Sequence, residues 1–206
     1  MVRRMLFRRT AAGRLVIRYP AMAEIIVVDY DLSWPHTFER LRAPIWRCIG
    51  EVATSIEHVG STSVPGLAAK PVIDMTIVVP TAAAMRTVID RLAVIGYRHQ
   101  GDLGVPGREA FARPQGTPDH HLYACVFGND ALRNHLAVRD YLRSNPSAAR
   151  AYGTLKKQLA ERFAGDIGGY VEGKTDFILA ILAGTDFSPD QITAIRALNS
   201  KSKPAG

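Results

Sequence analysis

Four small residues at positions 60–63, Gly-Ser-Thr-Ser, are the stretch of this 206-residue sequence with the clearest capacity for chemistry. Gly60 can adopt the positive φ that a sharp turn requires, and the three hydroxyls can accept backbone N–H groups or cap a short helix. Either arrangement leaves N–H groups that point outward and suit an anion such as phosphate. Gly60, Ser61, Thr62 and Ser63 are therefore candidate phosphate-binding residues.

A strand that carries one acid follows this turn. Residues 72–79 are mostly β-branched and lie between prolines, which indicates a buried strand. Side chains alternate along a strand, so Asp74 and Thr76 share one face. A lone acid is costly to bury, and we expect Asp74 to be paired with another group or to bind a metal. The opposite face carries Ile73, Met75 and Ile77.

The string EHVGSTSVPGLAAKPVIDM, residues 57–75, closely resembles the signature of the GrpB family, whose members look like nucleotidyltransferase-fold proteins. The resemblance implies a Gly-Ser turn that meets a nucleoside triphosphate, matched here by Gly60 and Ser61. It also implies an acid-x-acid pair that holds Mg²⁺ on the next strand. Asp74 matches the first acid, as metal ligand and catalytic residue, but Thr76 replaces the second. A hydroxyl binds Mg²⁺ more weakly than a carboxylate, so Thr76 argues against catalysis more than against the fold.

Further strings extend the resemblance beyond this loop. DYDLSWPHTFERL looks like the start of family members, and RDYLRSNP, YGTLKKQLA and YVEGKTDFI resemble their C-terminal helices. Basic side chains of these helices could neutralise phosphates, and Arg139 and Lys174 are preferred because they lie within the resembling strings. Lys70, just before the acid-bearing strand, is a further candidate phosphate-binding residue. Because acids are interleaved with these bases, a solvated surface is the alternative.

Two adjacent histidines, His120 and His121, stand at the start of another predicted strand. Neighbouring side chains on a strand point to opposite faces, and neither HxH nor HExxH spacing is present, which argues against a zinc site. The resemblance implies a similar His-containing strand beside the acid-bearing strand. His121 is therefore a candidate ligand for phosphate, and Arg113, at the end of the preceding predicted strand, is another. A strand-edge histidine satisfied by hydrogen bonds is the alternative.

Periodicity and capping signals place the remaining elements. The apolar face of the first helix, which Ser33 precedes, carries Phe38, Leu41, Ile45 and Ile49. No internal repeat or linker divides residues 24–187, which indicates one α+β domain: a nucleotidyltransferase-like mixed β-sheet with flanking helices and a helical C-terminal part. Strands are expected at 25–30, 97–100, 109–113 and 121–127, and further helices at 81–95, 130–144, 147–163, 170–183 and 189–198.

Basic charge is concentrated at the N-terminus. The formal net charge is +7, but six arginines precede the first acid, Glu24, and without them it falls to +1. We expect residues 1–23 to be a flexible basic extension and residues 188–206 to be a short helix with a mobile tail. The extension could contact RNA or anionic lipid, or it could be a solvated segment preceding a true start at Met22. The charge distribution therefore indicates no specific nucleic-acid partner.

The composition, with 47% hydrophobic and 22% charged residues, is that of a soluble globular protein. No run of about eighteen apolar residues appears, so we expect no membrane span. Cys48 and Cys125 lack CxxC spacing and are expected to be reduced core residues of a cytoplasmic protein. The oligomeric state stays open.

Three functions remain open from the sequence. The first is Mg²⁺-dependent transfer of a nucleotidyl group to an unknown acceptor, against which Thr76 counts. The second is non-catalytic binding of a nucleotide or phosphorylated small molecule. The GrpB-like domain also resembles one fused to dephospho-coenzyme A kinases, which implies an accessory role in coenzyme A metabolism. The third is an interaction role with a vestigial pocket.

Overall fold

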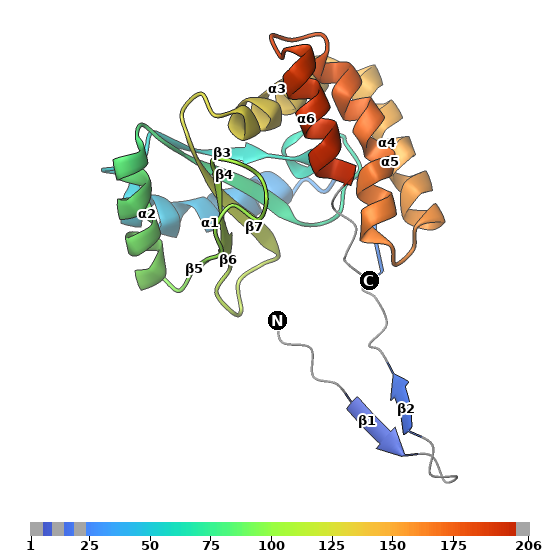
Figure 1. Cartoon of the computed structure of the whole chain (residues 1–206), viewed down its shortest axis with the longest axis horizontal. Coiled ribbons are helices and arrows are strands. Elements are labelled where there is room, and N and C mark those ends of the chain that lie inside the picture. The colour runs from blue at the N-terminus through green and yellow to red at the C-terminus, as the bar shows by residue number, and fades with distance from the viewer. Residues whose placement is uncertain (1–5, 10–14, 19–23, 201–206) are drawn as a thin grey trace.

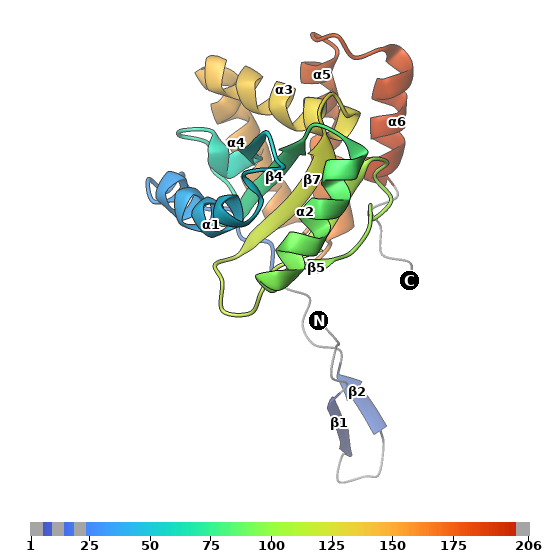
Figure 2. The same ribbon diagram turned by 90° about the vertical axis from the view of Figure 1, so that its left-hand side faces the viewer.

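The computed structural model describes residues 6–9, 15–18 and 24–200. A five-stranded sheet lies between two groups of helices (Figure 1). Helices α1 (Trp34–Ile49) and α2 (Ala82–Val94) cover one face, and the turned view in Figure 2 shows α2 in front of the strands. The other side carries α3 (Asp130–Ser144), α4 (Pro146–Arg162), α5 (Ile167–Leu182) and α6 (Pro189–Ser200). The molecule thus has the α+β class that the sequence predicts.

The sheet is mixed. Its strands are β3 (Ser55–Val59), β4 (Ile73–Val79), β7 (His120–Val126), β6 (Arg108–Ala112) and β5 (Arg98–His99), in that spatial order. The central pair, β4 and β7, is parallel, and the other neighbours are antiparallel. The register sets Asp74 opposite Val59 on one side and His121 on the other. The acid-bearing strand and the histidine-bearing strand are therefore direct neighbours.

The main hydrophobic core lies between the sheet and helices α1 and α2. The predicted apolar face of β4 is confirmed, because its three alternate residues are buried in this core together with Leu122 and Ala124 of β7. The predicted stripe of α1 is buried there too. The opposite face of β4 is thereby left to Asp74 and Thr76, which point toward the second group of helices. The residues of that first core contributed by β4 and α1 include Ile73, Met75, Ile77, Phe38, Leu41, Ile45 and Ile49.

A second apolar cluster joins the C-terminal helices to the loop after the Gly60 turn. Val64 and Leu67 of this loop pack with Leu142, Tyr152 and Ile181, which come from α3, α4 and α5. The loop is therefore held between the sheet and the helical layer. Because of this packing, the helices are fixed directly over the end of β4 that bears Asp74.

Two expected elements differ in the structure. Residues 25–30 do not form a strand; Val28 alone bridges to Ala69, through two hydrogen bonds of 2.9 Å. Helix α5 begins at Ile167, three residues before the expected Tyr170, because Asp166 caps it by accepting the Gly169 N–H at 3.0 Å. The other predicted helices and strands are present, with ends that differ by a few residues.

The N-terminal segments β1 (Leu6–Arg9) and β2 (Leu15–Arg18) pair antiparallel. The rest of the expected extension 1–23, and the expected tail 201–206, lie outside the described residues. Cys48 and Cys125 are free thiols, the first partly buried and the second buried. Among the described helices, we find none that combines the length and the apolar character needed to cross a bilayer.

A buried histidine connects α1, β3 and the turn after β3. The ring of His58 stacks on Phe38, with centroids 4.6 Å apart and planes inclined by 6°. Its Nε2 donates to the hydroxyl of Thr62 at 3.0 Å, and that hydroxyl donates to the carbonyl of Val72 at 3.4 Å. Burial lowers the pKa of His58 to about 4. The folded protein therefore holds this ring in its neutral form at neutral pH.

We expect His58 to make the protein acid-sensitive. In the unfolded chain its pKa is near 6.5, so between about pH 6.5 and pH 4 the unfolded state binds a proton that the folded state does not. The free energy of unfolding should fall across that window, with His58 contributing on the order of 2–3 kcal/mol. His58→Gln should lose less stability between pH 7 and pH 4.5 than wild type in urea denaturation. His36→Gln, on the exposed side of α1, is the control, and an unchanged loss in His58→Gln would contradict the assignment.

Candidate functional site

The Gly60 turn can be made only by glycine. Gly60 has φ 68° and ψ −172°, a backbone region that residues with a side chain essentially never occupy. A Cβ atom there would also lie 2.9 Å from Cγ of Asp74, which is too close for any real contact. The turn continues as a short 3-10 helix, η1 (Ser61–Ser63), and Ser63 Oγ donates to the carbonyl of Gly60 at 2.6 Å. The glycine therefore brings the backbone of the turn against the carboxylate.

The carboxylate of Asp74 is paired with a histidine. Its Oδ1 accepts a hydrogen bond from Nδ1 of His121 at 2.8 Å, across the β4–β7 pair. Both side chains keep access to solvent, with 30% of the Asp74 side chain and 53% of the His121 side chain exposed. The carboxylate of Asp74 is therefore partly stabilised by His121 and remains accessible to a ligand.

Two adjoining cavities open beside this pair. The larger, of about 380 Å³, lies between the Gly60 turn, the start of β4, and helices α4 and α5. The smaller, of about 270 Å³, extends from it beneath α3 and shares Ser61, Asp74 and Lys174 with it. Of the described residues that line them, Asp74 is the one carboxylate. The polar lining of the larger cavity consists of Ser61, Thr62, Lys70, Asp74, His121, Lys156, Tyr170 and Lys174.

Two lysines of the larger cavity are held in surroundings that weaken their charge. Lys156 is buried, donates to the carbonyl of Ala68 and lies 4.8 Å from the centre of the Tyr152 ring. Burial lowers the pKa of Lys156 to about 7. Lys174 lies 4.4 Å from the centre of the Tyr170 ring, and burial together with the charge of Lys70 lowers its pKa to about 8. Keeping both Lys156 and Lys174 charged at neutral pH therefore costs electrostatic free energy.

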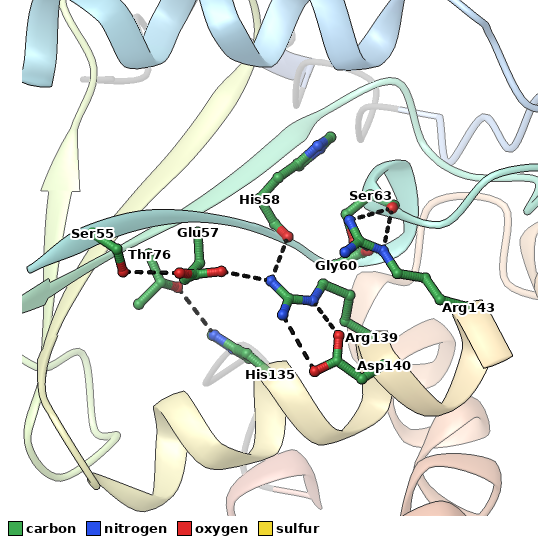
Figure 3. Close-up of polar contacts among 10 residues, drawn as sticks. All are labelled: Ser55, Glu57, His58, Gly60, Ser63, Thr76, His135, Arg139, Asp140 and Arg143. Atoms are coloured by element: carbon green, nitrogen blue, oxygen red, sulfur yellow. Dashed lines mark hydrogen bonds and ion pairs between the residues drawn. The ribbon is translucent and has the colours of Figure 1, made fainter.

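Arg139 connects the helical layer to the sheet. Its Nη1 donates to Glu57 Oε2 at 2.8 Å and to the carbonyl of His58 at 3.3 Å, and its Nε donates to Asp140 at 2.7 Å (Figure 3). Burial raises the pKa of Glu57, but hydrogen bonds from Arg139 and Ser55 outweigh it and hold that pKa below its usual value. Only 12% of the Arg139 side chain is exposed. Although Arg139 lines the smaller cavity, its guanidinium is engaged by two carboxylates.

Arg143, one helical turn further along α3, holds the Gly60 turn itself. Its Nε and Nη2 donate to the carbonyl of Ser63 at 3.0 and 2.8 Å (Figure 3). The turn is thereby fixed from the helical layer, in addition to its packing on the sheet. Both guanidinium groups are hydrogen-bonded within the protein, and they hold the site in position.

Thr76, at the position where the resemblance implies a second acid, is fully buried. Its hydroxyl hydrogen-bonds Nδ1 of His135 at 3.3 Å (Figure 3). Burial lowers the pKa of His135 to about 4, so this imidazole is neutral at neutral pH. Thr76 and His135 therefore form an uncharged contact between β4 and α3 where a carboxylate would have carried charge.

The donor set limits which metal site the residues can form. Among the described residues, no group of three or more His, Cys, Asp and Glu side chains is arranged to hold a metal. Mg²⁺ is commonly held by one or two carboxylates together with substrate phosphates. Asp74 fits one such ion shared with a ligand, but the pair of ions typical of phosphoryl chemistry does not fit.

The structure brings together most of the predicted site residues. Gly60, Ser61, Thr62, Lys70, Asp74, His121, Arg139 and Lys174 line one or both cavities. Ser63 instead stabilises the turn from within, and Arg113 lines neither cavity, because its guanidinium contacts Asp119 and donates to the carbonyl of Thr117 at 2.8 Å. Lys156 also lines the larger cavity but is not among the site residues predicted from the sequence. The sequence feature that could have indicated it is its position on the apolar stripe of α4, four residues after Tyr152 and three before Leu159.

Known proteins resemble this chain over most of its length. Residues 24–183 match the family described as GrpB protein. A solved structure of the conserved protein GrpB from Enterococcus faecalis has 35% sequence identity and a TM-score of 0.69, covering 82% of this chain and 98% of that chain. The Cid1 poly(U) polymerase with bound Mg 3'-dATP has 12% identity and a TM-score of 0.51, covering 76% of this chain and 50% of that chain. The fold is therefore nucleotidyltransferase-like, as predicted.

Curated relatives agree with the structural match. UPF0157 protein YqkA of Bacillus subtilis is 35% identical over 155 residues, which are 75% of this chain. This chain spans less than half of that relative, 45%. A dephospho-CoA kinase of Mycolicibacterium paratuberculosis is 28% identical over 188 residues, covering 79% of this chain and 46% of the kinase. By the family match and by its likeness to the solved E. faecalis protein, the chain belongs to the GrpB family.

Proposed function

We propose that the larger cavity binds a phosphate-bearing ligand, a nucleotide or a phosphorylated small molecule. The observation that carries this proposal is the convergence of Lys70, Lys156 and Lys174 on one cavity beside the Gly60–Ser61 turn. Three lysines give the cavity an excess of positive charge over its single carboxylate. Lysine ammonium groups and the hydroxyls of the turn are the donors that phosphate oxygens accept from.

The lowered pKa values of two lysines support an anionic ligand. Lys156 and Lys174 are crowded and desolvated, which disfavours their charged forms. A bound phosphate would supply the opposite charge and restore those forms. The cavity is thus poised to gain electrostatic free energy when an anion enters, whereas a neutral or cationic ligand would gain none.

Mg²⁺ enters the proposal together with the ligand. Asp74 would hold one ion jointly with the phosphate oxygens, and the ion would neutralise part of their charge. The remaining groups then act on the ligand directly: the turn positions a phosphate group, and the lysines balance its charge. The neutral Thr76–His135 contact favours binding over catalysis, because a second carboxylate is missing from this face of β4.

Nucleotidyl transfer is the second candidate, and the likeness of the fold to a polymerase supports it. An accessory role in coenzyme A metabolism is supported by the dephospho-CoA kinase relatives, which contain a similar segment. Both candidates require a phosphate-bearing ligand in the same cavity. Test ligands should therefore include nucleoside triphosphates and phosphorylated coenzyme A precursors.

Lys174→Met should weaken ligand binding. It removes a charge-assisted contact to phosphate, so the dissociation constant for ATP or dephospho-coenzyme A should rise roughly tenfold or more in calorimetric titration. Lys157→Met is the matched control. Lys157 follows Lys156 on the neighbouring helix α4, but it pairs with Asp29 and lines neither cavity. No heat from any of these ligands with folded wild-type protein would refute the proposal, and so would equal affinity of the two variants.

Asp74→Asn should affect binding in opposite directions with and without Mg²⁺. In a chelating buffer, the loss of a negative charge beside the phosphates should strengthen triphosphate binding severalfold. With Mg²⁺ present, the variant should lose the added affinity that the ion gives to wild type. Titrations in both buffers measure this. An equal effect of Mg²⁺ on wild type and variant would show that Asp74 does not hold the ion.

Binding should also take up protons. At pH 8 a terminal phosphate with a pKa near 6 is already ionised, whereas Lys156 and Lys174 are partly neutral. Their pKa values rise in the complex, so roughly one to two protons should enter with ATP, and affinity should fall as the pH rises above 8. Calorimetric heats in buffers of different ionisation enthalpy count these protons. Lys174→Met should take up fewer, and heats independent of the buffer would contradict the assignment.

A further inference from the structure

A third cavity continues the site in the direction away from the lysines. It has a volume of about 360 Å³ and lies between residues 105–108, the start of α3 and one side of α6. It shares Asn134, His135 and Asn199 with the smaller of the two cavities described above. The three cavities thus adjoin through shared lining residues, from the lysines past Asp74 to α6. We refer to this third space as the α6 cavity.

Some polar groups around the α6 cavity have no hydrogen-bond partner among the described residues. The Nε of Arg108 is buried without a hydrogen bond, although buried polar groups nearly always have one. Within the described part of the chain, the side-chain amides of Asn134 and Asn199 also make no hydrogen bond. The Arg108 guanidinium is held in place over the ring of Tyr123, 4.3 Å from its centre. Hydrogen-bonding groups of Arg108, Asn134 and Asn199 are therefore left unused by the described part of the protein beside this space.

The one acid of the described lining, Asp130, forms an ion pair with Arg133 and accepts hydrogen bonds from Gln191, and the rest beyond Arg108 is apolar or uncharged. Ala194, Ile195 and Leu198 of α6 form one wall, and His135 is neutral at neutral pH. No lysine lines this cavity among the described residues. Unlike the lysine-lined cavity, this space suits a flat, uncharged group with hydrogen-bonding edges. Asparagine amides pair well with such edges because each offers a donor and an acceptor side by side.

We propose that the α6 cavity binds the nucleobase of a nucleotide whose phosphates occupy the lysine-lined cavity. This inference rests on the proposed function and adds the ligand class: a nucleotide, not a small phosphorylated metabolite. Helix α6 lies beyond residues 24–183, the part matched to the family, so this wall of the base site is formed by a segment outside that match. Asn134 and Asn199 read the base edge, and Arg108 donates its unused N–H to a ring nitrogen or carbonyl oxygen.

The test compares ligands with and without a base. Inorganic tripolyphosphate and the four common ribonucleoside triphosphates are titrated into the full-length protein with Mg²⁺. At least one nucleotide should bind about tenfold or more tightly than tripolyphosphate, because the base adds contacts that the inorganic ion lacks. If all four nucleotides bind no more tightly than tripolyphosphate, the base site is refuted while the phosphate site stands. If neither kind of ligand binds, the proposed function fails as well.

Two substitutions locate the added affinity. Asn134→Leu removes an amide that has no partner among the described residues, and Ala194→Trp fills the cavity from α6. Each should lower the affinity for the preferred nucleotide to that for tripolyphosphate and leave tripolyphosphate binding unchanged. Ala197→Trp, on the same helix but not in the lining, is the matched control and should keep the preference. A nucleotide preference that survives both Asn134→Leu and Ala194→Trp would overturn the proposal, and thermal unfolding of each variant confirms that it is folded.

Discussion

Strand β4 is packed on both faces, and the arrangement of the molecule follows from this constraint. One face is apolar and closes the main core with α1 and α2. The other carries Asp74 and Thr76 and faces the helical layer, and each of these side chains has a hydrogen-bond partner. His121 and His135 supply those partners from β7 and α3. The alternation of a single strand therefore fixes both the core and the floor of the candidate site.

Arginine and lysine have different roles around this floor. Arg139 and Arg143 each bind groups of the protein itself, and their planar guanidinium groups hold α3 against β3 and against the Gly60 turn. Lys70 and Lys174 instead line open space. The arginines set the shape of the site, and the lysines set its charge. This division explains how a rigid turn can lie beside a cavity whose positive charge is not neutralised by the protein.

Much of this organisation could be predicted from the sequence, because it depends on local patterns. Alternation in β4, the apolar stripe of α1 and the glycine at position 60 all report directly on backbone geometry. Long-range partners could not be predicted in the same way. Nothing near Arg139 in the sequence indicates that Glu57, 82 positions away, accepts a hydrogen bond from it. Arg113 pairs with Asp119 across a turn whose shape the sequence does not specify.

Two predictions from the sequence that differ from the structure also have physical explanations. Residues 25–30 have the composition of a strand, yet no free sheet edge takes them in, and Val28 pairs with a loop residue, Ala69. Glycines at 168 and 169 look like a break before α5, but Gly169 is needed inside the helix because a Cβ atom there would lie 2.5 Å from the Phe163 ring.

The central pair of the sheet carries one more consequence. Asp74 and His121 are 47 positions apart, and strands β6 and β5 join β3 and β4 in one sheet through that parallel contact. Closing so long a segment costs chain entropy before the contact forms. We therefore expect the β4–β7 pairing to govern the folding rate, and the two sides of the candidate site to meet only late in folding.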